Sequence, residues 1–218
     1  MVVELYYVPS SPPCRAVLLT ARAIDLKMNL NFINVMEGEQ FEPYFLKMNP
    51  LHTVPTMKDG DLSLGESRVI MTYLVNKYGK TDALYPKDPK KRAMVDQRLY
   101  FEIVALNPHI RDYIFPVFFE ESVLNKSAIP GICSVLNIIN NLLGKTAFFA
   151  GETLTIADLS LVTYISTLDV LDFDLSQYQN IIKWYERVKK SAPGYEDENG
   201  KNVLSFRDKV HELCKGRT

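Results

Sequence analysis

The feature that most constrains the fold is a change of pattern close to Asp88. Before it, strand-like apolar runs at 2–8 and 30–35 flank a helical stretch at 13–25. After it, apolar residues recur at helical spacing and no convincing strand is found. The chain is therefore predicted to hold two differently built parts, joined by a Gly-, Asp- and Pro-containing linker at 79–87.

The first part has the element order of a known domain type. A strand, a crossover helix and a second strand make a βαβ unit whose two strands run parallel. A short helical piece, a hairpin around an Asp-Gly pair and a closing helix follow, at 43–48, 56–64 and 67–78. Gly79 is a usual residue just past a helix end. This order predicts a thioredoxin-like domain over residues 1–80.

The second part is predicted to be an all-helical domain over residues 88–218. Its helices are expected at roughly 89–119, 125–143, 155–170, 178–190 and 200–214. Asp88 and Pro89 supply an N-cap and a proline at the first helical position. Pro108 and Pro116 should kink or break the first helix. The fold class is thus an α/β domain followed by an all-α domain.

Composition and charge exclude several functions. Lys and Arg number 25 against 26 Asp and Glu, and this net charge of -1 gives no field that would attract nucleic acid or an anionic membrane. No stretch approaches the roughly 20 apolar residues that cross a bilayer, and the N-terminus lacks a signal-peptide pattern. The cysteines, Cys14, Cys133 and Cys214, lack paired or zinc-type spacing, which favours reduced thiols in the cytoplasm and no metal site.

The turn from Pro9 to Arg15, between the first strand and the first helix, is the first candidate site. Redox proteins of the thioredoxin fold carry Cys-x-x-Cys here, with a thiolate at the helix N-terminus. This chain has Ser11 and Cys14 instead, so it keeps the helix terminus but lacks the exposed thiol. Such a turn suits the thiolate of another molecule. The alternative is that Ser11 only caps the helix and Cys14 is a small buried apolar residue.

The energies are adequate for activating a bound thiol. A thiol of pKa about 8.5 must drop by about two units to be mostly ionised at neutral pH, roughly 2.7 kcal/mol. A hydrogen bond from a hydroxyl to a charged sulfur contributes about 1.5 to 3 kcal/mol and a helix N-terminus about 0.3 to 1 kcal/mol. Together the two account for the shift.

Two further loops could hold an extended ligand. Pro55 precedes the hairpin strand and suits a cis peptide bond, which would turn the backbone of Val54 outward to pair with a peptide. His52 nearby could meet a carboxylate, although a single loop histidine is more often incidental.

The other loop, 65–68, offers groups for an amino-acid head. Ser67 is predicted as the N-cap of the next helix and could hold a carboxylate, while Glu66 could accept from an ammonium. The alternative is ordinary capping, with Glu66 and Arg68 as solvated charges.

These three sites share one edge of the predicted domain and complement a γ-glutamyl tripeptide thiol. The chain as a whole resembles insect glutathione transferases of the delta/epsilon group. The matching stretches are 11–18, 49–56, 66–68, 97–102 and 154–160. The resemblance implies a cytosolic glutathione transferase with glutathione as co-substrate and no metal or redox cofactor. It also implies a homodimer, with Arg68, Tyr100 and Phe101 as candidate interface residues.

The resemblance implies roles for individual residues. Ser11 activates the glutathione sulfur, Val54 pairs with the cysteinyl backbone, and His52 lies near the glycyl carboxylate. Gln40 replaces a histidine usual in the delta group, and it can hydrogen-bond but not carry charge. The full expected glutathione site is Gln40, His52, Thr53, Val54, Pro55, Glu66, Ser67 and Arg68.

An apolar stripe in the helical part is the candidate electrophile pocket. It comprises Ile110, Arg111, Phe115, Phe118 and Phe119, with Phe206 of the last helix placed to close over them. Such a stripe is usually core, but the resemblance implies that it faces the sulfur. Asn107 stands where delta-group members tend to have tyrosine, which makes the pocket locally less aromatic.

The leading functional prediction is detoxification, in which glutathione thiolate attacks a small apolar electrophile. One alternative is a non-catalytic carrier that uses the same cleft for hydrophobic ligands. Another is a glutaredoxin-like thiol exchanger that uses Cys14.

The stretch from Thr155 to Asp158 has the pattern of a capping box, which is predicted to serve folding alone.

Overall fold

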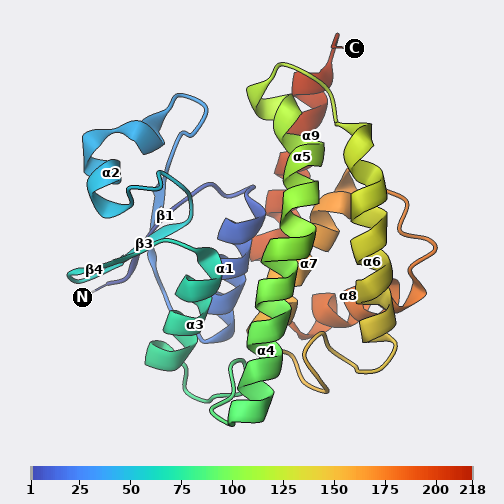
Figure 1. The fold of residues 1–218 in the computed structure, drawn as a ribbon. Helices are drawn as coiled ribbons and strands as arrows, with labels where there is room; N and C mark the ends of the chain where they lie inside the picture. Colours follow the sequence, from blue (N-terminus) through green and yellow to red (C-terminus); the bar gives the residue numbers. More distant parts are fainter. Residues whose placement is uncertain (1, 218) are drawn as a thin grey trace.

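The structure is a computed structural model that describes residues 2–217. Figure 1 shows a small sheet with its helices beside a larger group of helices. The N-terminal elements are β1 (Glu4–Tyr7), α1 (Pro12–Ala23), β2 (Asn29–Phe32), η1 (Glu39–Phe41), α2 (Pro43–Met48), β3 (Thr56–Asp59), β4 (Leu62–Leu64) and α3 (Ser67–Tyr78). The C-terminal elements are α4 (Pro89–Phe101), η2 (Glu102–Leu106), α5 (Asn107–Phe119), η3 (Lys126–Ala128), α6 (Ile129–Leu143), α7 (Ile156–Val170), α8 (Gln179–Ser191), η4 (Glu196–Gly200) and α9 (Lys201–Cys214).

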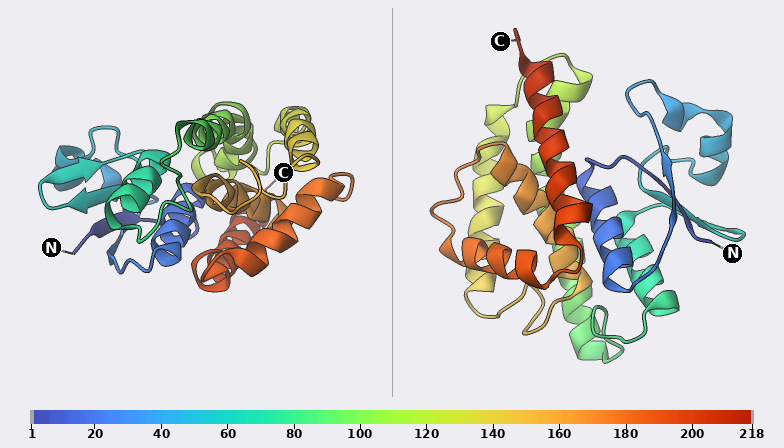
Figure 2. Two further views of the ribbon diagram at one scale, coloured as in Figure 1. Left: turned by 90° about the horizontal axis from the view of Figure 1, so that it is seen from below. Right: turned by 180° about the vertical axis from the view of Figure 1, so that it is seen from behind.

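The sheet confirms the predicted thioredoxin-like order. Its strands lie in the order β2-β1-β3-β4, with β1 and β2 parallel and the other pairs antiparallel. In this register Leu5 lies opposite both Leu30 and Met57. Leu5 and Met57 are fully buried, because α1 and α3 pack side by side between the sheet and the other helices (Figures 1 and 2).

The helical part also follows the predicted pattern, with one difference in its first helix. The chain stays helical from 89 to 119, but a π-helical turn, η2, separates α4 from α5. Pro108 lies in the first turn of α5, directly after the π-helical turn. Pro116 lies inside α5 and does not end it, since the helix continues to Phe119.

Helix α7 is the centre of the helical part. Nearly all its residues are buried, and it packs against α1, α4, α8 and α9. The predicted capping box at its start is confirmed: Ala157 N donates to Thr155 Oγ1 at 3.3 Å and Thr155 N to Asp158 Oδ2 at 2.9 Å. The Asp158 carboxylate also accepts from Trp184 Nε1 at 2.8 Å, which ties α7 to α8.

The stretch between α3 and α4 contains neither helix nor strand. The division into domains at 80 and 88 stays a prediction. Within residues 2–217, none of the helices combines the length and the apolar character needed to cross a membrane.

Candidate active site

Ser11 lies at the N-cap of α1, directly after the turn that follows β1. Its backbone is extended, its N–H donates to Val8 O at 3.1 Å, and its carbonyl accepts from Arg15 N at 2.9 Å. The Ser11 side chain makes no capping hydrogen bond. Ser11 is thus the N-cap residue of α1, but its hydroxyl makes no hydrogen bond to the backbone of the helix and stands at a helix N-terminus where it can meet an anion.

Cys14 lies one turn further along α1 and is fully buried. Val8 N donates to its Sγ at 3.5 Å. Burial raises the pKa of the Cys14 thiol to about 11, so it stays protonated at neutral pH. A buried, protonated thiol cannot serve as the nucleophile of a thiol exchanger.

Ser11 opens into a cleft of about 250 Å³ between the two parts of the chain. Its walls come from the start of α1, from the loops after β1 and β2, from the loop before β3, and from α5, α7 and α9. The lining residues are Val8, Ser10, Ser11, Pro12, Pro13, Val35, Val54, Asn107, Ile110, Arg111, Ile114, Phe115, Phe118, Phe119, Tyr164 and Phe206. All seven residues predicted for the electrophile pocket thus lie in one cleft with Ser11.

The far wall of the cleft is mostly apolar and aromatic. Phe118 stacks on Phe206 with ring centroids 5.6 Å apart, so the last helix closes over the stripe on α5 as expected. The Arg111 guanidinium lies over the Phe115 ring at 4.6 Å. Ile114 also lines this wall and was not predicted there, although it follows Ile110 by one helical turn.

Val54 is the residue of the 49–56 loop that lines the cleft. The Val54–Pro55 peptide bond is cis, as predicted. Thr53 O accepts from Thr56 Oγ1 at 2.8 Å, and His52 is exposed with its ring 4.8 Å from that of Phe41. The loop therefore places Val54 on the wall of the cleft.

Gln40 lies in η1, beside the loop after β2. Its Nε2 donates to Val35 O at 3.3 Å, which fixes the orientation of the amide. Its Oε1 is buried and has no hydrogen-bond partner among residues 2–217. Within the described part of the chain, Gln40 therefore keeps an acceptor that no donor uses.

The start of α3 differs from the prediction. The N-cap is Glu66, not Ser67, because Glu66 takes the left-handed backbone (φ +59°) that ends the connection from β4. Ser67 is the first helical residue and its Oγ accepts from Arg68 Nη1 at 2.9 Å. The description of Arg68 as a solvated charge is also wrong, since its guanidinium is paired with the buried Glu102 and donates to Tyr164 Oη at 3.0 Å.

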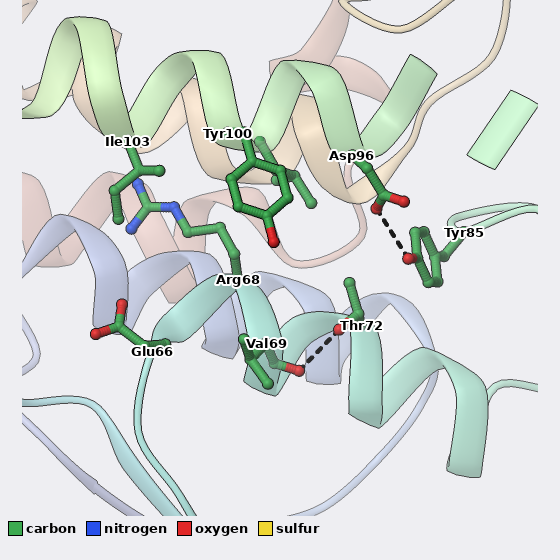
Figure 3. A pocket seen from close by; sticks show the side chains of 9 residues that line it. Glu66, Arg68, Val69, Thr72, Tyr85, Asp96, Tyr100 and Ile103 are labelled. Atoms are coloured by element: carbon green, nitrogen blue, oxygen red, sulfur yellow. Dashed lines mark hydrogen bonds between the residues drawn. The ribbon is translucent and has the colours of Figure 1, made fainter. Parts of the chain in front are cut away.

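A second hollow, of about 440 Å³, lies between α3 and α4 (Figure 3). It is lined by Glu66, Arg68, Val69, Thr72, Tyr85, Asp96, Leu99, Tyr100 and Ile103. Tyr100 is 71% exposed at its edge, whereas Phe101 packs against the core beside Phe149. Arg68 thus borders this hollow and not the cleft at Ser11.

Arg15 is a buried cation that the sequence analysis did not single out. Its guanidinium donates to Ser166 Oγ at 3.0 Å and to Thr163 O at 3.1 Å, and its Nε donates to Ser10 O at 3.3 Å. Burial lowers its pKa to about 10, which leaves it charged at neutral pH. Arg15 therefore ties the turn beside Ser11 to α7, and no short-range pattern in the sequence marks this contact.

Comparisons with known proteins agree with this architecture. Residues 5–82 match the family model "Glutathione S-transferase, N-terminal domain" and residues 106–192 match "Glutathione S-transferase, C-terminal domain". A delta-class glutathione transferase of Nilaparvata lugens is 44% identical, with a TM-score of 0.93, over 97% of this chain and 99% of that one. A Bombyx mori glutathione transferase is 41% identical, with a TM-score of 0.92, over 96% and 98%. An epsilon-class enzyme of the housefly Musca domestica is 36% identical, with a TM-score of 0.91, over 99% of both chains.

Proposed function

Because the chain belongs to the glutathione S-transferase family, we propose that Ser11 is the residue that activates glutathione for conjugation to an apolar electrophile. Glutathione conjugation is the activity of the family. The observation that carries the proposal is the position of Ser11: its side chain does not cap α1, and it shares one cleft with the apolar wall of α5 and α9.

The proposed chemistry begins with the glutathione sulfur at the N-terminus of α1. The Ser11 hydroxyl donates a hydrogen bond to the thiolate, and the first N–H groups of α1 add a favourable field. The thiol proton leaves to water. The thiolate then attacks the electrophilic carbon of a substrate held against Ile110, Phe115 and Phe118, and forms the carbon–sulfur bond.

The remaining groups are proposed to hold the two ends of glutathione. The backbone of Val54 pairs with the cysteinyl unit, and His52 and Thr53 lie toward the glycyl end. Gln40 Oε1, a buried acceptor with no donor among the described residues, suits an N–H group of the ligand and not its carboxylate.

The γ-glutamyl end is proposed to meet Glu66 and Ser67. Arg68 acts through Ser67, because its guanidinium is already shared among Glu102, Tyr164 and Ser67 Oγ. We further propose that the protein is a cytosolic homodimer that detoxifies small electrophiles.

The test compares two neighbouring serines that line the same cleft. Ser11→Ala should lower kcat/KM for conjugation by about 10²-fold or more, by analogy with the loss of one donor to a developing anion. Ser10→Ala is the matched control and should keep most of the activity. Binding of a hydrophobic dye should persist in both variants. Full conjugation in Ser11→Ala would refute the assignment.

A further inference from the structure

A chain of hydrogen bonds connects α3, through α7, to the first residue of α5 in the lining of the cleft. The Arg68 guanidinium, paired with the buried Glu102, donates to Tyr164 Oη at 3.0 Å. The Tyr164 hydroxyl in turn donates to Asn107 Oδ1 at 3.0 Å. Tyr164 is 2% exposed, and both Tyr164 and Asn107 line the cleft.

The chemistry of this chain fixes which way the Asn107 amide points. A guanidinium can only donate, so the Tyr164 oxygen accepts from Arg68 and its single hydrogen is left for Asn107. That hydrogen needs an acceptor, which is Oδ1 and not the amide nitrogen. Burial raises the pKa of Tyr164 to about 12, so the hydroxyl keeps its hydrogen at neutral pH.

The Asn107 Nδ2 group is then left with its two hydrogens unused. No hydrogen bond joins Nδ2 to another residue within 2–217. The backbone N–H of Asn107 is already taken, since it donates to Glu102 O within the π-helical turn. The mostly apolar far wall of the cleft therefore contains an oriented amide donor at the start of α5.

We propose that Asn107 Nδ2 is a specificity-determining donor that favours electrophiles with a carbonyl oxygen next to the reactive double bond, namely α,β-unsaturated aldehydes and ketones. The inference rests on the proposed function, because it needs glutathione thiolate at Ser11. The sulfur bonds to the β-carbon, and the electron pair of the carbon–carbon double bond moves to make an enolate. Nδ2 donates to the enolate oxygen, and the α-carbon takes a proton from water.

The donor matters only where charge develops on an oxygen. Displacement of halide from a benzyl halide places no charge on an oxygen, so Nδ2 has nothing to stabilise in that reaction. The measurable quantity is therefore the ratio of kcat/KM for a 2-alkenal to kcat/KM for benzyl bromide, with saturating glutathione. Both reactions use one preparation, so any unfolded fraction cancels from the ratio.

Asn107→Leu, which keeps the side-chain size and removes the donor, should lower this ratio about tenfold or more. Tyr164→Phe should lower it in the same direction, because the amide is then free to turn its oxygen into the cleft. Ile138→Leu is the control: Ile138 is 46% exposed on α6 and does not line the cleft, so its ratio should stay within about twofold of wild type.

Two results would overturn the inference. One is an unchanged ratio in Asn107→Leu while both electrophiles are still conjugated. The other is a fall of the ratio in Arg111→Met in place of Asn107→Leu, which would assign the donor to the guanidinium over Phe115. Failure of the proposed function looks different, since Ser11→Ala would then leave the conjugation of both electrophiles intact.

Discussion

At the scale of single residues, the proposed function assigns the hydroxyl to Ser11 and the thiol that it acts on to glutathione. Bound glutathione should therefore ionise below its free pKa, and the rate of the chemical step should rise with pH along a limb centred near about 6 to 7. Ser11→Ala should move this limb upward by about one to two units, equivalent to roughly 1.4 to 2.7 kcal/mol. The measurement is the pH profile of kcat/KM for the electrophile with glutathione saturating, because this constant then reports ionisation in the complex with glutathione.

Cys14→Ser is the control for this pH profile. The Cys14 pKa is about 11 and the thiol is buried, so Cys14 does not titrate in the range of the limb. The variant should leave the midpoint nearly in place. If Cys14→Ser abolished the limb while Ser11→Ala kept it, the protein would be acting through its own thiol.

At the scale of elements, the pairing of β3 with α3 carries a pH dependence of stability. Asp59 ends β3 and accepts from three side chains of α3: Tyr73 Oη at 2.8 Å, Lys77 Nζ at 2.8 Å and Tyr78 Oη at 2.6 Å. The hydrogen bonds from Lys77 and then Tyr78 hold the pKa of Asp59 down to about 2, against an ordinary value of 3.8. The charged carboxylate is therefore favoured more in the folded than in the unfolded state.

The charged Asp59 carboxylate therefore stabilises the folded state above about pH 4. This stabilisation is lost as the pH falls toward about 2 and the carboxylate becomes protonated. Asp59→Asn should lower stability at pH 7 and flatten the fall of stability between pH 4 and pH 2, measured by urea unfolding at each pH. Asp112→Asn, an exposed change on α5, is the control and should match wild type within about 0.5 kcal/mol. An unchanged acid limb in Asp59→Asn would contradict this account.

Element boundaries were predictable wherever the signal is local. The Asp-Gly pair, Gly79 and the capping box at Thr155 each mark a turn or a helix end within a few residues, and the structure has each of them. The π-helical turn at 102–106 was not predicted, because it replaces one helical hydrogen-bond pattern with another and leaves the apolar spacing helical. The N-cap of α3 was misplaced by one residue, since Glu66 is not a residue expected at positive φ.

At the scale of the whole molecule, the unpredicted parts of the site are contacts between distant segments. Arg15 reaches Ser166, and Arg68 reaches Tyr164, which then reaches Asn107. In each of these contacts the two residues are dozens of positions or more apart in the sequence, so no local spacing predicts that they meet. Periodicity groups Ile110 and Phe118 on one helical face, and the family resemblance placed that face at the cleft. The sequence therefore predicts the walls of the cleft better than the polar connections behind them.

The proposed homodimer is also a property of the whole molecule, and the hollow between α3 and α4 is the surface expected to form it (Figure 3). Tyr100, 71% exposed, and Val69, 49% exposed, present apolar surface at this hollow. Light scattering at micromolar concentration should give twice the mass of one chain. Tyr100→Glu should shift the mass toward that of one chain, because it would bury an unpaired charge in the interface.

Ile138→Glu is the matched control for this charge, since Ile138 is 46% exposed on α6, an element that does not line the hollow. It should leave the mass unchanged. Circular dichroism on both variants shows whether the helices are retained. A fall in the mass measured by light scattering can then be assigned to dissociation of the dimer. A wild-type protein that scatters as a single chain, or a Tyr100→Glu variant that stays dimeric, would move the interface away from α3 and α4.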